Sequence, residues 1–311
     1  TYSDDPLRMM RAIRFASQLH FTIEEQSLQA IKDQHERLDI ISGERITEEL
    51  NKIMLSSKPS IGLRLLFETN LLPHFLPEVA DLQGVEEVDG QLHKDNFFHT
   101  LQVVDNISEN TNNLYLRYAA LFHDIGKPVT KKFIPGTGWT FRHHEFVGAK
   151  MVKKVFQRLK LPLGKELRYT QKIVRMSSRP IAITDDQATD SAARRLLFDA
   201  GDDIDDLMLL CEADITTQNE KKKKRFLQNF QAVREKMKEV EEKDKIRNWQ
   251  PPIDGEEIMK TFNLNPGPEI GLIKEAIKEA ILEGTIANDP AEARKFMLAR
   301  GQELGLTPNK N

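Results

Sequence analysis

Apolar residues recur every three or four positions along most of the chain, and this spacing predicts amphipathic helices. Residues 6–19 are the first such segment, with Met9, Ile13 and Ala16 on one face. Further periodic segments follow at residues 44–55, 61–68, 97–107, 114–124, 144–159, 165–176, 190–199, 202–217, 220–247, 269–283 and 290–304. We therefore expect an all-α fold.

One segment departs from the helical pattern. Within residues 132–142, apolar and aromatic residues lie on both sides of the sequence Pro-Gly-Thr-Gly at 135–138. A glycine-rich turn between two short apolar runs is typical of a hairpin. We expect one short β-hairpin in an otherwise helical protein.

Length and chain breaks suggest how the helices are grouped. The 311 residues are enough for two or three domains, at about 100–200 residues each. We expect a small helical bundle over residues 1–84 and a second helical unit with the hairpin over 85–217. Residues 218–311 then form a charged helix and a helical tail that is interrupted by prolines near 251 and 267.

Composition excludes several classes of protein. No apolar run approaches the roughly 18 residues that a membrane span needs, and no charged-then-apolar leader opens the sequence. The single cysteine, Cys211, excludes an internal disulfide and a cysteine-based zinc site. We expect a cytoplasmic protein with no membrane partner and no disulfide partner.

Charge is distributed unevenly along the chain. Lys and Arg number 45 and Asp and Glu number 48, so the net charge of −3 gives no overall attraction to nucleic acid. Residues 220–247 nevertheless hold eleven basic and six acidic residues. This segment begins with Lys221, Lys222, Lys223, Lys224 and Arg225. The run is a candidate track for RNA phosphates, and the alternative is an ordinary solvated helix face.

Two histidines and two aspartates form the strongest candidate site. His123 and Asp124 are adjacent at the end of an apolar helix, and Gly126 after them breaks that helix. His99 lies on or beside the core-facing stripe of an earlier helix. Asp214 falls on the apolar face of the segment 202–217, where a carboxylate is costly unless it is paired or bound to metal.

This set of donors suits a divalent ion, namely Mg, Mn, Ni, Fe or Zn. Such an ion lowers the pKa of bound water and polarises a phosphoryl oxygen, which is the chemistry of phosphate-ester hydrolysis. Lys127 follows the pair and is placed to meet a phosphate. His144 is a candidate acid or base, with His143 and Glu145 beside it. Taken singly, a buried histidine is more often a core residue, and Asp214 can cap a helix or pair with an arginine.

At His99, at the sequence His-Asp-Ile-Gly-Lys over 123–127 and at Asp214, the chain resembles the HD phosphohydrolase superfamily. The resemblance implies that His99, His123, Asp124 and Asp214 are the metal ligands of an HD-type helical domain. Many members of that superfamily carry a further histidine at the position that corresponds to about residue 144 of this chain. Whether His143 or His144 takes that place is left open.

A second resemblance covers nearly the whole chain. Residues 4–16 resemble the neck motif of class II tRNA nucleotidyltransferases and bacterial poly(A) polymerases. Residues 43–53 and 62–66 resemble the RNA-binding region of that family, and the tail around 266–271 resembles its HD-bearing members.

The neck resemblance implies that Asp5 and Arg8 read the base of CTP or ATP, with Asp4 where a glutamate is usual. A carboxylate and a guanidinium can form paired hydrogen bonds with the edge of a base. The alternative is that Asp5 caps the helix and Arg8 is solvated.

The same resemblance implies a catalytic head, with a Gly-Ser phosphate loop and Asp-x-Asp carboxylates, before residue 1. We therefore expect a headless portion of a tRNA nucleotidyltransferase that binds tRNA, with CTP and ATP as partners of the full-length enzyme. Without those carboxylates these residues alone are not expected to add nucleotides. The HD site is expected to hydrolyse a phosphoester at an RNA end. Two rivals are a free-standing HD nucleotide phosphohydrolase and an RNA-binding scaffold with a structural metal.

Overall fold

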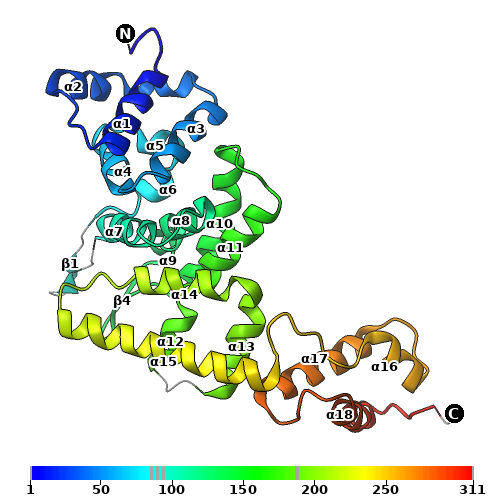
Figure 1. Ribbon diagram of the computed structural model, residues 1–311. Helices are drawn as coiled ribbons and strands as arrows, with labels where there is room; N and C mark the ends of the chain where they lie inside the picture. The colour runs from blue at the N-terminus through cyan, green and yellow to red at the C-terminus, as the bar shows by residue number, and fades with distance from the viewer. Residues whose placement is uncertain (1, 85–86, 89–90, 93–94, 186–188, 310–311) are drawn as a thin grey trace. The chain divides into compact units, whose positions relative to one another are not determined.

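The computed structural model describes residues 2–84, 87–88, 91–92, 95–185 and 189–309. It confirms the all-α expectation (Figure 1). The chain forms two compact units, Thr1–Ser178 with Asp205–Leu227, and Arg179–Ile204 with Gln228–Asn311. The three-part division expected from the sequence stays a prediction. Across the described ranges, no helix has both the length and the apolar character that a membrane span requires.

The first unit opens with a bundle centred on α1 (Leu7–Leu19), which packs on α3 (Gly43–Met54) and α4 (Pro59–Glu68). Met9 and Ile13 of α1 are fully buried, as the periodicity predicts. The remaining elements of the bundle are α2 (Glu25–Gln34), the 3₁₀ helix η1 (His35–Ile40), α5 (Leu72–Phe75) and α6 (Pro77–Ala80). Helix α2 was not expected, because Ile31 is its one buried residue and its pattern is therefore weak.

Four longer helices in the same unit form the framework around the candidate site. They are α7 (Asn96–Ser108), α8 (Leu114–Phe122), α10 (His144–Arg158) and α11 (Lys165–Met176). Helix α8 packs between α7 and α11, and α11 packs on α10. Side-chain caps fix where α7 and α8 begin, since Asp95 Oδ1 accepts from Phe97 N at 2.9 Å and Asn113 Oδ1 from Tyr115 N at 3.1 Å.

A buried arginine fixes α8 to its surroundings. Arg117 is 2% exposed, although its neighbours in the helix are apolar. Its Nε donates to the Thr111 carbonyl oxygen, and Nη1 donates to those of Met54 and Ser56. Its Nη2 donates to the Ser108 carbonyl oxygen and to a side-chain oxygen of Asn112. All five guanidinium N–H groups are therefore satisfied.

Short strands occur at two places. The expected hairpin is confirmed as β3 (Lys132–Ile134) and β4 (Gly138–Thr140), which pair antiparallel with Phe133 opposite Trp139. The short helix α9 (Lys127–Thr130) precedes it. A second antiparallel pair, β1 (Glu87–Val88) with β2 (Gln91–Leu92), was not expected.

The segment expected to be one helix over 202–217 is shorter than expected. It consists of the 3₁₀ turn η2 (Gly201–Asp203) and α14 (Ile204–Ala213), and the next helix is α15 (Glu220–Asp244). Asp214 N still donates to the Leu210 carbonyl oxygen at 3.0 Å, after which the chain leaves the helix. Asp214 thus lies just beyond the helix rather than on its apolar face.

The second unit contains the remaining helices of the chain's described part. They are α12 (Arg179–Asp185), α13 (Asp190–Ala200), α16 (Gly255–Phe262), α17 (Pro268–Glu283) and α18 (Pro290–Glu303). Helix α17 packs on α13, α16 and α18. Arg195 of α13 pairs with Glu279 at 2.7 Å and with Glu283, both on α17.

Candidate metal centre

The candidate centre is built from the ends of helices in the first unit. His99 lies in the first turn of α7, where the Asp95 cap sets the orientation of that turn. His123 and Asp124 directly follow α8, and Asp214 directly follows α14. Helix ends allow adjacent residues to turn toward one point, which the middle of a helix does not.

The four side chains meet at contact distances. Ligand atoms of His99, His123 and Asp124 all lie within 4.8 Å of one another. Asp214 Oδ1 lies 2.8 Å from His99 Nε2 and 3.5 Å from His123 Nε2. Asp124 Oδ2 lies 3.3 Å from His123 Nε2 and 3.9 Å from His99 Nε2. The structure therefore brings together all four of the residues expected to bind metal.

Hydrogen bonding orients the His123 ring. Its Nδ1 lies 2.7 Å from the carbonyl oxygen of Ala120. A carbonyl only accepts, so Nδ1 carries a hydrogen, and Nε2 is the ring nitrogen that faces the two carboxylates. Carbonyl oxygens often hold metal-binding histidines in this way.

Two atoms of the cluster have incomplete hydrogen bonding. Within the described part of the chain, buried atoms His123 Nε2 and Asp214 Oδ1 have no hydrogen-bond partner in suitable geometry. Such orphaned atoms are rare in folded proteins. A divalent cation coordinated by both atoms would satisfy them, so the donor set fits a metal.

Burial and charge act in opposite directions on these groups. Burial alone lowers the pKa of His123, but Asp124 and Asp214 outweigh it and raise the pKa to about 10. Burial alone would raise the pKa of Asp124, but His123, His144 and Lys127 hold it well below its usual range. Burial alone would also raise the pKa of Asp214, but His123 and His99 outweigh it and lower that pKa. In the ion-free protein His123 therefore carries a proton that a metal must displace.

Lys127 and His144 lie at the Asp124 side of the cluster. Lys127 Nζ is 2.7 Å from Asp124 Oδ2. His144 Nδ1 is 2.9 Å from the Phe141 carbonyl oxygen, so the neutral ring presents Nε2, which lies 3.5 Å from Asp124 Oδ1. His143 is exposed. The structure thus places His144, and not His143, beside the cluster.

Gly126 permits this approach of α10. A Cβ added there would lie 2.0 Å from the His144 carbonyl oxygen and 2.8 Å from Gly148 N. Both atoms are backbone, so neither can move aside cheaply. The helix break predicted at Gly126 therefore also brings His144 to Asp124.

Thr216 is a contributing residue to which the sequence analysis gave no role. Its Oγ1 lies 2.9 Å from His99 Nδ1. This contact leaves His99 Nε2 facing Asp214. The sequence signal was modest: Thr216 follows Asp214, a residue that carries the HD resemblance, by two positions.

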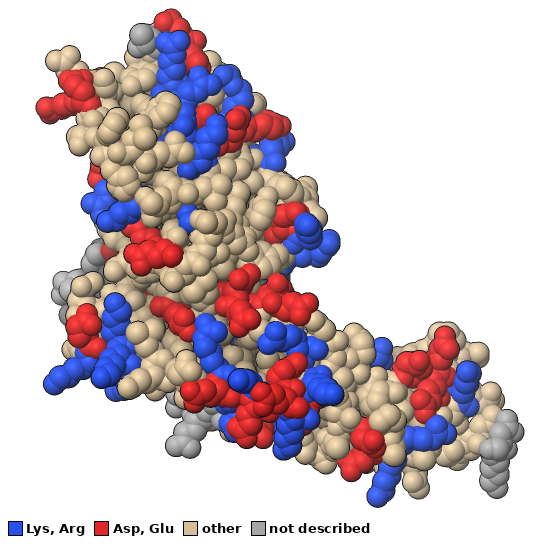
Figure 2. All heavy atoms as spheres, viewed as in Figure 1, with Lys and Arg blue, Asp and Glu red and all other residues tan. Residues whose placement is uncertain are grey.

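Asp5 and Arg8 lie in a separate ionic network on α1. Arg8 Nε is 3.8 Å from the Asp5 carboxylate, and Arg11 and Arg45 also lie within 4.0 Å of it. Figure 2 shows Lys and Arg gathered over these N-terminal helices, with Asp and Glu among them. Among the described hydrogen bonds, none runs from a backbone N–H of α1 to the Asp5 carboxylate, so Asp5 is not a side-chain cap.

The basic run lies at the start of α15. Its members Lys221, Lys222, Lys223, Lys224 and Arg225 are all exposed. No ion pair joins any of them to a described carboxylate at the metal cluster. The run is a solvated helix face that is free to meet a polyanion.

Two family models match the chain. Residues 20–82 match the family described as the probable RNA and SrmB-binding site of polymerase A. Residues 96–219 match the HD domain family, and this range contains every member of the metal cluster.

Relatives of known activity extend the match to nearly the whole chain. The A-adding tRNA nucleotidyltransferase of Deinococcus radiodurans is 31% identical over an alignment of 310 residues, covering 96% of this chain and 69% of that protein. The chain belongs to the tRNA nucleotidyltransferase family. The CC-adding tRNA nucleotidyltransferase of Thermus thermophilus is 32% identical, covering 94% of this chain and 66% of that protein. Against the multifunctional CCA protein of Vibrio campbellii, at 32% identity, the match covers 52% of this chain and 40% of the relative.

Solved tRNA nucleotidyltransferase structures share the fold. The Bacillus stearothermophilus CCA-adding enzyme, solved with CTP, superposes with a TM-score of 0.63 at 19% identity. The match covers 98% of this chain and 64% of that one. The chain thus spans about two thirds of the Deinococcus, Thermus and Bacillus enzymes.

Proposed function

We propose that this chain binds tRNA and hydrolyses a phosphoester with a divalent metal held by His99, His123, Asp124 and Asp214. The observation that carries the proposal is the meeting of these residues at one buried point with two unsatisfied polar atoms. The match of residues 96–219 to the HD domain family supports it. The proposed metal is one of Mg, Mn, Ni, Fe and Zn, all of which accept this donor set.

When bound, the ion would supply an activated water and polarise a phosphoryl oxygen. The protein's own residues then have distinct tasks. Lys127, 2.7 Å from Asp124, offers a cation to the phosphate oxygens. His144 Nδ1 donates its hydrogen to the Phe141 carbonyl oxygen. The other ring nitrogen, Nε2, therefore faces Asp124 and is proposed to accept a proton during hydrolysis.

The substrate of the metal site is proposed to be a phosphate at an RNA end, either a 2′,3′-cyclic phosphate or a phosphomonoester. The match of residues 20–82 to an RNA-binding family supports an RNA partner. The basic run at the start of α15 is proposed to contact tRNA phosphates. The RNA end that carries this phosphate is expected to belong to a tRNA in the cytoplasm.

For nucleotide addition, Asp5 and Arg8 are proposed to read CTP or ATP in the full-length enzyme. Their partial exposure, 29% and 53% for the side chains, leaves them accessible to a base. Residues 1–311 alone are not expected to incorporate either nucleotide.

The test is turnover of defined substrates by the purified chain. An RNA oligonucleotide ending in a 2′,3′-cyclic phosphate or a 3′-phosphate is incubated with Mg²⁺, Mn²⁺ or Ni²⁺. We expect metal-dependent hydrolysis that Asp124→Ala abolishes and that the exposed control Asp33→Ala retains. No hydrolysis with any of these metals would reject the phosphohydrolase.

The same preparation separates the two rivals. Turnover of free nucleotides without tRNA affinity would favour a free-standing nucleotide phosphohydrolase. Metal and tRNA binding without any hydrolysis would favour an RNA-binding scaffold with a structural ion.

A further inference from the structure

A cavity in the N-terminal bundle lies apart from the metal centre and from the α1 ionic network. Its volume is about 420 Å³, and it is lined by residues of the α1–α2 connection, of α2 and of α4, and by Lys58 directly before α4. This size is in the lower part of the range for small-ligand sites, about 300–1,000 Å³. The cavity can therefore admit a group the size of a nucleotide.

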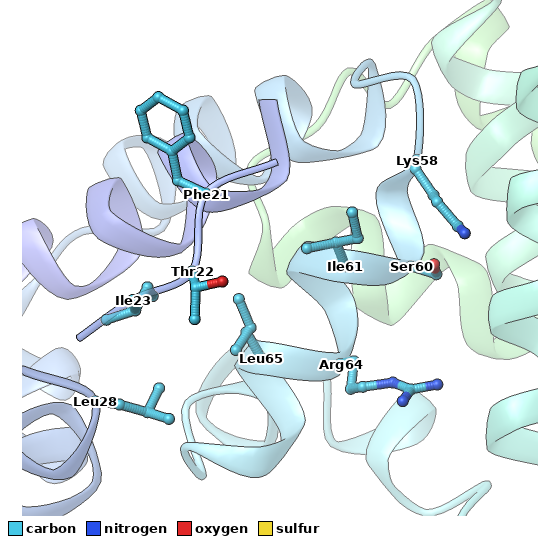
Figure 3. Close-up of a pocket in the computed structure, with 9 residues that line it drawn as sticks. All are labelled: Phe21, Thr22, Ile23, Leu28, Lys58, Ser60, Ile61, Arg64 and Leu65. Carbon is cyan, nitrogen blue, oxygen red and sulfur yellow. The ribbon is translucent and has the colours of Figure 1, made fainter. Parts of the chain in front are cut away.

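The lining has two chemically different ends (Figure 3). Ile23, Leu28 and Leu65 gather at one end and form an aliphatic surface. At the other end Lys58 and Arg64 extend toward the same side. The Thr22 hydroxyl points into the space between these ends. An occupant should therefore be apolar at one end and anionic at the other.

The cationic end is available for an anion. Across the described residues, no carboxylate lies within salt-bridge distance of Lys58 or Arg64. Arg64 lies over the Phe98 ring, 5.3 Å from its centroid, which holds the guanidinium without neutralising it. The charge of Asp105 acts on Lys58, but its carboxylate also accepts from Ser60 N at 2.9 Å and from Ser60 Oγ at 2.6 Å.

Phe21 lies at the rim of the cavity. Its side chain is 66% exposed, and its ring points away from the aliphatic cluster (Figure 3). Exposed aromatic rings are typical of surfaces on which bases of single-stranded nucleic acid stack. All of the lining residues fall within the segment that matches the RNA-binding family.

We propose that this cavity holds one nucleotide of a bound RNA, with its base on the aliphatic surface and its phosphate at Lys58 and Arg64. The inference rests on the proposed RNA-binding function and adds a specific site to it. Phe21 would then face the neighbouring nucleotide of the same strand.

The experiment measures binding of a fluorescent acceptor-stem minihelix with a single-stranded 3′ end, over a range of salt concentrations. Lys58→Ala combined with Arg64→Ala should weaken binding about tenfold and reduce the salt slope by about two, one for each lost phosphate contact. Thr22→Trp fills the cavity from an exposed position, so it should weaken binding severalfold and leave the salt slope unchanged. Lys153→Ala with Lys154→Ala, two exposed lysines of α10, is the charge-matched control and should change binding less than twofold.

The outcomes separate this inference from the proposed function. If the wild-type chain binds the minihelix and both cavity variants bind it equally well, the cavity is not the nucleotide site although RNA binding stands. If only the cation variant weakens binding, the contact is a charged surface and the cavity assignment is overturned. If the wild-type chain does not bind the minihelix at all, the RNA-binding function itself fails.

A free nucleotide carries the same base and phosphate as a nucleotide of RNA, so it is the other candidate occupant of the cavity. Competition with AMP and CMP at millimolar concentration distinguishes the two sources. Loss of AMP binding in Thr22→Trp without any effect on minihelix binding would assign the cavity to free nucleotides and overturn the RNA assignment. Thermal melting of each variant establishes that it is folded, and Arg64→Ala alone replaces the double variant if that one unfolds.

Discussion

The two ends of α8 both hold charged side chains away from solvent, but they differ in how completely those side chains are satisfied. Near the start of the helix, Arg117 uses all five of its N–H groups on oxygen atoms of the protein. At the other end, His123 Nε2 is buried without a hydrogen-bond partner among the described residues, as is Asp214 Oδ1 nearby.

This difference separates structural from functional burial of charge. A buried charge costs free energy unless protein groups compensate it. Around Arg117 the compensation is complete, so the residue needs no ligand and serves to join the α3–α4 and α7–α8 connections to the helix. Around His123, by contrast, His123 Nε2 and Asp214 Oδ1 have no hydrogen-bond partner among the described residues, and a cation bound by both atoms would satisfy them. The following predictions test each end of α8 separately.

The largest effect is expected at the structural end. Arg117→Met removes five hydrogen bonds and leaves the carbonyl oxygens of Met54, Ser56, Thr111 and Ser108 without this donor. We expect the free energy of unfolding to fall by about 3–5 kcal/mol, measured by urea denaturation. As a control, Arg168→Met on the exposed surface of α11 should change the free energy of unfolding by less than about 0.5 kcal/mol. Metal bound per folded molecule should not change, and selective loss of metal would contradict the division of roles.

A smaller effect is expected from the residue that orients His99. Thr216→Val removes the Oγ1 contact to His99 Nδ1 but none of the four proposed ligands. Partners of this kind typically contribute 10–100-fold to metal affinity, so we expect a loss of about tenfold in Mn²⁺ titration calorimetry. Thr217→Val is the neighbouring control. An unchanged affinity for Thr216→Val would show that His99 is oriented by other contacts.

Proton competition should produce the most gradual effect. The pKa of His123 is raised to about 10 in the ion-free protein, so a proton occupies the ligand nitrogen at neutral pH. Metal binding must release it, and Mn²⁺ affinity should therefore rise about tenfold per pH unit between pH 6 and 8. The sign follows because raising the pH removes the competing proton. An affinity independent of pH would place the metal away from His123.

Much of the fold follows from local sequence signals. Helices α7, α8, α10 and α11 lie within about two residues of their expected bounds, because each combines an apolar stripe with a cap or a break. The β3–β4 hairpin follows from its glycine-containing turn. Helix α2 and the β1–β2 pair were missed because short polar segments carry little periodicity, and their existence depends on the elements that they contact.

The sequence predicted which four residues lie together, but not how they are arranged. The types and order of His99, His123, Asp124 and Asp214 indicated a metal site, although the end of α14 was placed too late. The sequence did not distinguish His143 from His144, because that choice depends on the close approach of α10 at Gly126. Arg117 was overlooked, although an arginine inside an otherwise apolar helix is a signal of burial or function.

Metal content of the purified chain tests the central claim most directly. We predict close to one divalent ion per molecule in the wild-type chain and in the exposed control Asp33→Ala, and none in Asp124→Ala, by elemental analysis of folded protein. Equal metal content in wild type and Asp124→Ala would contradict the account, because the ion would then be held elsewhere.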